Sequence, residues 1–247
     1  MGVAAEGVPG AMMDLAEYIR SRSRKVEPGL SDEALAKLEA ELGVRLAEEV
    51  RRLIAQVGGY EPLCEVRWQM DEEDVTFALG PSDWCPVYRE AFPAYLQLLQ
   101  NGCGDAWILD IDPGTGECGC VVLASHDPSS LRFHFRDLED FVVKTLDPNF
   151  DLAAHDDATF RNLPPEGLPV TEARHSIDVV IREYANMLPD SYHLFDMRSG
   201  ELPYGFCWGM HGADKRLRFG RELLFATEPE PRSALSQWLR KIFGKGR

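Results

Sequence analysis

At 247 residues, with 45% hydrophobic and 10% aromatic side chains, the chain is long enough to bury a large core and is not of the disordered type. Its net charge of −15, with 27 acidic against 13 basic residues in positions 1–150, argues against a direct nucleic-acid interface and suits either a basic partner or solubility alone. No apolar run reaches the roughly 18 residues of a membrane span, no secretion signal is evident, and the six cysteines are scattered, so we expect a cytoplasmic protein with reduced thiols and no membrane contact.

The first part of the chain favours helices. After a Gly-rich tail, a short helix is expected within Ala11–Lys25. Ser31 or Asp32 then caps a second helix that ends at Gly43, and a third is expected over Ala47–Val57. The apolar residues expected to face the core from the second and third helices are Leu35, Leu38, Leu42, Val50, Leu53, Ile54 and Val57.

The next stretch mixes strand and helix signals. Leu63–Trp68 and Val75–Leu79 are predicted strands, and a loop containing Trp84 follows them. Tyr88–Gln100 is ambiguous, because its apolar residues have helical spacing but Pro93 restricts a helix to starting near that position.

A β-hairpin is predicted at the centre of the chain, within residues 101–128. Ala106–Ile111 forms its first strand, with Trp107, Leu109 and Ile111 on the face turned to the second and third helices. The segment Asp112–Gly116 is turn chemistry, and Glu117–Ala124 is the return strand.

The rest of the chain is predicted as a strand and a helix, a linker, and a C-terminal unit. Leu131–Phe135 is a short strand, and Asp137 caps a helix through Leu146. Residues 147–169 resemble a linker because they contain several prolines. Residues 170–247 form an α-β-β-β-α extension of unknown role or a small second domain; its expected elements are His175–Leu188, Tyr192–Met197, Leu202–Met210, Leu217–Ala226 and Ser233–Phe243.

These features together resemble the SUKH superfamily. The resemblance is carried by Gly102-Cys-Gly-Asp105 before Trp107-Ile-Leu-Asp110, then a valine-rich strand, His126-Asp127 and a Phe-rich helix. Upstream, the two leucine-rich helices fit as well, although Ala47 stands where the family usually has proline. The superfamily includes fungal cell-wall regulators of the Smi/Knr type and bacterial immunity proteins.

The resemblance implies an α+β fold with a mixed or antiparallel sheet packed with helices, and it covers roughly residues 30–146. The expected organisation is therefore a tail and short helix at 1–29, a SUKH-like domain at 30–146, a linker at 147–169 and the C-terminal extension at 170–247.

Two groups of residues have side chains of the kind that bind metals, and structural roles explain both groups better. With Asp110 as the first ligand of a calcium loop, the sixth position is Thr115 and not glycine, so Asp110 and Asp112 are better explained as a strand end and a turn. Cys118 and Cys120 are expected on one face of a strand, where core packing is favoured over zinc. No nucleophile, phosphate-loop or metalloprotease signature is present, so we expect no catalytic residue, metal or cofactor.

Partner contacts are expected at the open end of the hairpin, where His126-Asp127 would lie beside the Gly104-Asp105 turn. The alternative is that these residues only shape turns, whereas the resemblance implies that they border a binding groove. Trp84, the only tryptophan in a predicted loop, is a candidate hot spot. The full set of expected partner-binding residues is Trp84, Gly104, Asp105, Asp110, His126 and Asp127.

On the basis of the resemblance, the leading hypothesis is a non-enzymatic binding protein that neutralises a toxin, with a basic nuclease domain as the expected target. The second hypothesis is a regulatory scaffold of the Smi/Knr type. The third is a metal-dependent enzyme that uses Asp105, His126 and Asp127.

Overall fold

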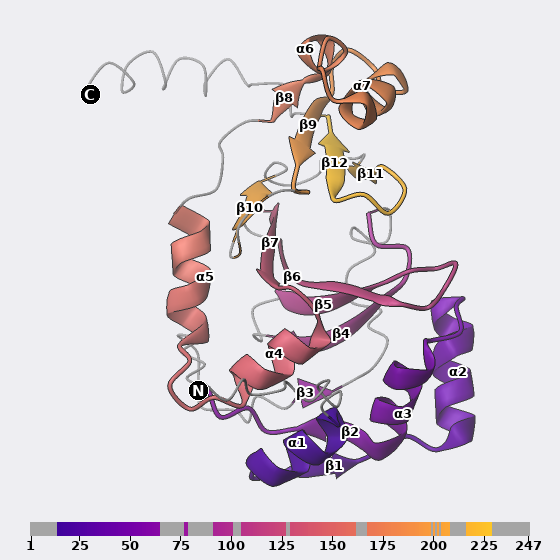
Figure 1. The fold of residues 1–247 in the computed structure, drawn as a ribbon, viewed down its shortest axis with the longest axis vertical. Coiled ribbons are helices and arrows are strands. Elements are labelled where there is room, and N and C mark those ends of the chain that lie inside the picture. Colours follow the sequence, from indigo (N-terminus) through magenta and orange to yellow (C-terminus); the bar gives the residue numbers. More distant parts are fainter. Residues whose placement is uncertain are drawn as a thin grey trace, which may run out of the picture.

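The computed structural model describes residues 14–64, 77–78, 91–100, 105–126, 129–161, 167–198, 200, 202, 204–207 and 216–228. Its helices and antiparallel sheets form an α+β fold, as predicted (Figure 1). Among the residues described, none of the helices has the length and hydrophobicity that a bilayer crossing requires.

The helices of the first part begin at the expected caps. Asp14 accepts the N–H groups of Ala16 and Glu17 at the start of helix α1, and Ser31 caps α2 in the same way. Gly43 ends α2 in the left-handed conformation, at φ 71°. Asp137 caps α4. The bounds of these helices are Leu15–Arg22 for α1, Asp32–Leu42 for α2, Glu48–Gln56 for α3 and Leu138–Thr145 for α4.

Helix α3 has no side-chain cap, because its first position is preceded by Ala47. The Ala47 N–H instead donates to the Gly116 carbonyl at 3.0 Å, so the hairpin turn satisfies this end of the helix. Gly116 has φ 73°, and a Cβ there would lie 1.9 Å from the Arg45 carbonyl oxygen. Only glycine fits at this contact.

The central sheet has five antiparallel strands in the order β10-β7-β6-β5-β4. Their bounds are Tyr95–Gln100 for β4, Ala106–Ile111 for β5, Cys118–His126 for β6, Ser129–Phe135 for β7 and Tyr204–Cys207 for β10. A small sheet beside it joins β1 (Val26–Pro28), β2 (Val57–Tyr60) and β3 (Phe77–Ala78). The predicted hairpin is confirmed as β5 and β6.

The C-terminal part forms a third sheet in the order β11-β12-β9-β8, with helices beside it. Helix α5 (Leu152–Arg161) precedes this part of the chain. The elements of the C-terminal part are β8 (Leu168–Pro169), α6 (Val170–Ala173), α7 (Val179–Asn186), β9 (His193–Asp196), β11 (Arg216–Arg218) and β12 (Leu224–Thr227). Because β10 pairs with β7, this part of the chain completes the central sheet instead of standing apart from it.

The two faces of the central sheet are buried against different partners. Trp107, Leu109 and Ile111 pack with the apolar residues of α2 and α3, as predicted. Ile108 and Phe133 on the opposite face pack with aromatic residues of the C-terminal part. Those aromatic residues are Phe195, Phe206 and Phe225. In Figure 1 the central sheet accordingly lies between the N-terminal helices and the C-terminal unit.

Two sequence predictions fail in the segments that precede and follow the central hairpin. The helix considered near Pro93 is instead strand β4; Tyr95, Leu96, Leu98 and Leu99 are all buried, so the sequence has no clean period of two. The expected linker at 147–169 contains α5, because its prolines lie outside Leu152–Arg161 and the Asp151 carboxylate accepts a capping hydrogen bond from the Ala154 N–H.

The C-terminal unit also differs in detail. The helix expected at His175–Leu188 is α7, which begins only at Val179, so Ile177 precedes it and is 99% exposed. The strand expected at Leu217–Ala226 is a hairpin that turns at Gly220, with φ 55°. Most of Leu63–Trp68 and all of Ser233–Phe243 lie outside the described residues, and β3 lies within the predicted Val75–Leu79.

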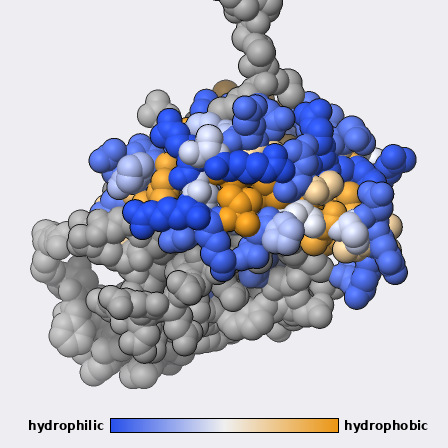
Figure 2. All heavy atoms as spheres, turned by 90° about the horizontal axis from the view of Figure 1, so that it is seen from below, coloured by the Kyte–Doolittle hydropathy of each residue, from blue (hydrophilic) through white to orange (hydrophobic). Residues whose placement is uncertain are grey.

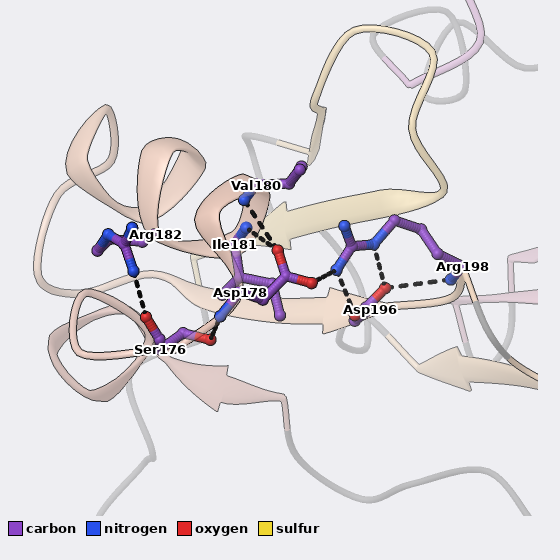
Figure 3. A network of polar contacts seen from close by, with 7 residues as sticks. All are labelled: Ser176, Asp178, Val180, Ile181, Arg182, Asp196 and Arg198. Atoms are coloured by element: carbon purple, nitrogen blue, oxygen red, sulfur yellow. Dashed lines mark hydrogen bonds and ion pairs between the residues drawn. The ribbon is translucent and has the colours of Figure 1, made fainter.

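A polar network holds α7 against β9 (Figure 3). Asp178 caps α7 with one carboxylate oxygen and accepts from Arg198 with the other, at 2.8 Å. Arg198 also pairs with Asp196 at the end of β9, which lowers the pKa of that carboxyl. Ser176 and Arg182 join the same network. Since its polar groups bind one another, we assign this network a structural role.

Candidate functional site

The open end of the central hairpin brings part of the predicted site together. Ala106 of β5 faces Ala124 of β6, so Asp105 and His126 lie at the same end of the two strands. Asp105 is partly exposed. Trp84, Gly104 and Asp127, together with the side chain of His126, lie outside the described residues.

Asp110 lies at the other end of β5 and is only 4% exposed. Arg218 of β11 donates to its Oδ2 at 2.9 Å, and the Arg218 guanidinium lies over the rings of Phe92 and Phe225. Burial raises the pKa of Asp110, and Arg218 opposes that shift. The expectation that Asp110 contacts a partner therefore does not fit, because a residue far along the chain already occupies its carboxylate.

Asp112 has the turn role that the sequence indicated. Its Oδ1 accepts the N–H groups of Gly114 and Thr115 at 2.6 and 3.2 Å, and its Oδ2 pairs with Arg221. The hydrogen bond from Gly114 is the largest cause of its lowered pKa. Arg218 and Arg221 thus connect the β11–β12 hairpin to the segment Asp110–Asp112.

The two thiols of the return strand lie on opposite sides of the sheet, and the prediction that they share a face is wrong. The pairing shifts by one residue between Leu109–Val121 and Ile111–Cys118, so a bulge lies in β6. Cys118 packs on the helical side and Cys120 on the C-terminal side. Burial raises both thiol pKa values to about 12, so neither is a thiolate at neutral pH. In the part of the chain that the structure describes, no three His, Cys, Asp or Glu side chains are grouped to bind a metal.

A buried polar chain runs through the core beside α5. Trp107 Nε1 donates to His134 Nδ1 at 3.1 Å, and His134 Nε2 lies 3.2 Å from Asp156 Oδ1, in a geometry short of a hydrogen bond. Arg132 donates to the other oxygen of Asp156 at 2.8 Å. Because the indole N–H is a donor only, His134 Nδ1 carries no proton. Burial lowers the pKa of His134 to about 4, opposed by the nearby Asp156, so the ring is neutral. Because all four side chains are buried, we assign this polar chain a structural role.

The exposed surface of helices α2, α3 and α4 carries more acidic than basic side chains. Each of the helices α2, α3 and α4 has carboxylates in its first turn, where they meet the positive end of the helix dipole. The exposed acidic residues on these helices are Asp32, Glu33, Glu41, Glu48, Glu49 and Glu139.

A cleft of about 230 Å³ opens on this side, between the first turns of α1 and α4 and one face of α3. Leu15, Val50, Leu53 and Leu138 form much of its wall, and Cys118 of β6 contributes too. Asp14, Glu49, Asp137 and Glu139 are the carboxylates that line it. Figure 2, which views the end of the molecule where α1 and β1 lie, shows hydrophobic surface flanked by hydrophilic side chains.

No motif in the sequence indicates this cleft. Its only local signal is that α1, α3 and α4 each carry carboxylates at their start, which is also the ordinary pattern of helix capping. That the three helix faces meet follows from long-range packing, which no local pattern indicates.

Comparison with family models gives a match over residues 29–144 to the SMI1 / KNR4 family (SUKH-1). Comparisons with curated proteins and with solved structures give no match. The matched region contains α2, α3, α4 and strands β4 to β7, whereas α1 precedes it and the C-terminal unit follows it.

Proposed function

Residues 29–144 belong to the SMI1/KNR4 family (SUKH-1), and from that premise we propose that the chain is an immunity protein that binds and occludes a basic protein toxin. It would act by binding alone, because covering the active site of an enzyme is sufficient to stop it. A nuclease domain, whose surface must be basic to hold nucleic acid, is the target that this chemistry suits.

The observation that carries the proposal is the acidic helical side. The opposite face of the central sheet is covered by the C-terminal unit and by the ion pair between Arg218 and Asp110. We therefore take as the partner surface the one that carries the exposed carboxylates of α2, α3 and α4. Complementary charge of this kind accelerates encounter with a basic partner and disfavours acidic ones.

The open end of the hairpin stays part of the proposed interface. Asp105 and His126 lie there, and we retain Trp84, Gly104 and Asp127 as further contacts on the basis of their sequence positions. The protonated state of Cys118 and Cys120 agrees with a protein that does no chemistry at these thiols.

A regulatory scaffold is the second candidate, and a feature outside the family region favours it. Ile177, Val179 and Met187 of the C-terminal unit are 99%, 52% and 72% exposed. Exposed apolar side chains of this size mark contact surfaces in many proteins. A scaffold needs a second surface of this kind, whereas a toxin inhibitor needs only one.

The test is co-expression with a toxin candidate encoded beside this gene, followed by binding kinetics at several salt concentrations. We expect protection of the cells and an association rate that falls as salt rises, because screening at about 0.15 M leaves a Debye length near 8 Å. Trp84→Ala should raise the dissociation rate while leaving the association rate near that of the unaltered chain.

The immunity proposal is wrong if the toxin kills cells regardless of this chain and no complex forms at low salt. Capture of two different partners at once, one of them lost when Ile177 and Met187 are changed to Ser, would favour the scaffold. Metal analysis of the purified chain tests the enzyme hypothesis separately.

A further inference from the structure

We propose that the cleft between α1, α3 and α4 takes up one lysine or arginine side chain of the partner protein. The proposal rests on the proposed function, since it names the part of the acidic surface that would make the central contact. It concerns a single pocket and not the overall charge of the helical side.

The size of the cleft suits a small occupant. Its volume of about 230 Å³ is below the roughly 300–1,000 Å³ of pockets that hold cofactors or drug-sized molecules. A single long side chain is an occupant of the right scale. The apolar part of the wall is formed by Val50 and Leu53 of α3 together with Leu15 of α1 and Leu138 of α4.

The charge of the cleft selects a cation. Four carboxylates line it against one cation, Arg52. The N-termini of α1 and α4 add about half a positive charge each, so the cleft keeps a net charge of about −2. Asp14 and Asp137 are occupied as helix caps, whereas Glu49 and Glu139 are exposed and form no ion pair with any residue that the structure describes.

The two properties together describe lysine and arginine. Both side chains carry a charge on a long aliphatic stem, and such stems pack along apolar surface while the charged group meets carboxylates or water. A short cation would reach the carboxylates without covering the apolar wall. An apolar side chain would fill the wall but leave the carboxylates unpaired.

The cleft extends beyond the residues that match the family model. One of its walls is α1, which lies before the residues that match the family model. A pocket with a wall from outside the family region provides a way to distinguish one basic partner from another.

The experiment compares two synthetic peptides, pentalysine and the same peptide built from 2,4-diaminobutyrate, whose side chains carry the same charge on stems shorter by two methylene groups. Binding of each to the full chain is measured by calorimetry at about pH 6.5, where both side chains are charged. One to two buried methylenes at roughly 0.8 kcal/mol each correspond to about 4- to 15-fold tighter binding of pentalysine.

The variant Glu49→Gln/Glu139→Gln should bring the two affinities within about twofold of each other. Glu33→Gln/Glu41→Gln is the matched control, with the same change of charge on α2 outside the cleft, and should weaken both peptides equally and keep their ratio. Thermal melting of all variants shows whether they remain folded.

Equal affinity of the two peptides for the unaltered chain would overturn the inference, as would loss of the ratio in the control variant. A toxin complex that forms although the peptides are not distinguished would leave the immunity proposal standing without the pocket. If the chain distinguished the two peptides but formed no toxin complex, the pocket would stand and the immunity proposal would fail.

Discussion

Arg218 of β11 donates to the Asp110 carboxylate of β5 at 2.9 Å, across 108 positions of sequence. Both side chains are less than a tenth exposed, and Gly119 makes room for the carboxylate, since a Cβ there would lie 2.9 Å from Asp110 Oδ2. This ion pair joins the C-terminal unit to the central hairpin.

Breaking this pair is expected to be costly. Arg218→Met leaves a buried carboxylate without its partner, and we expect it to lower the free energy of unfolding by about 3–5 kcal/mol. Asp110→Asn/Arg218→Met should cost less than the sum of the two single changes, because the double variant buries no unpaired charge. Urea denaturation of the four proteins measures this coupling.

The ion pair between Lys25 and Glu27 provides the control, because the side chain of Lys25 is 62% exposed and that of Glu27 is 42% exposed. Glu27→Gln should change stability by less than about 1 kcal/mol. If Arg218→Met and Glu27→Gln lowered the free energy of unfolding by the same amount, Asp110 and Arg218 would have to be exposed to solvent.

The buried His134 predicts a loss of stability in acid. Its pKa is about 4 in the folded protein and about 6.5 when unfolded, so the unfolded chain binds the proton first as pH falls. The contribution of His134 is complete above about pH 6.5, declines as pH falls, and is lost below about pH 4. The full loss is roughly 3 kcal/mol, and the lowered pKa of His155 acts in the same direction.

Unfolding free energies between pH 7 and pH 4 measure this decline, and the His134 ring resonances should not titrate near pH 6.5. His175→Asn, a change at an exposed histidine, should keep the decline. A His134 that titrates normally would contradict the buried geometry.

The helical side of the sheet is tested by Leu109→Ala. Leu109 is fully buried against the helices, and we expect the change to cost about 2–5 kcal/mol. Met187→Ala, at a side chain that is 72% exposed, should cost less than about 0.5 kcal/mol. A small effect at Leu109 in denaturant melts would show a solvated strand.

Two glycines with nearly equal φ angles allow backbone strain to be measured apart from steric contact. Gly43 and Gly116 have φ 71° and 73°, but a Cβ at Gly43 would meet nothing within 4 Å whereas one at Gly116 would strike the Arg45 carbonyl. Gly43→Ala should cost about 1–2 kcal/mol, from backbone strain alone. Gly116→Ala should cost at least twice as much, since the start of α3 must also move. Similar melting temperatures for the two variants would contradict the close approach.

The sequence predicted those features that depend on neighbouring residues. The caps Ser31 and Asp137, the stop at Gly43 and the alternation of Trp107, Leu109 and Ile111 all act within a few positions, and the structure confirms them. Helix α5 was missed because the prolines at either end of its segment hid a ten-residue run free of proline and glycine.

The candidate site could be predicted only in part, for a physical reason. Asp110 has the appearance of a free carboxylate until Arg218 is known to reach it, and the bulge that separates Cys118 from Cys120 arises from strand pairing. The cleft likewise depends on three helices that meet in space. Such features are set by contacts between distant parts of the chain.

The position of β10 has a consequence for how the protein is made. A ribosome releases β4 to β7 well before Tyr204–Cys207, so the outer edge of β7 and the face bearing Phe133 wait for their partners while synthesis continues. An unpaired strand beside uncovered aromatic rings is the kind of surface that nascent chains lose to aggregation. The sheet is therefore completed only late in translation or after it, and a chaperone that shields the growing chain during that interval would raise its yield.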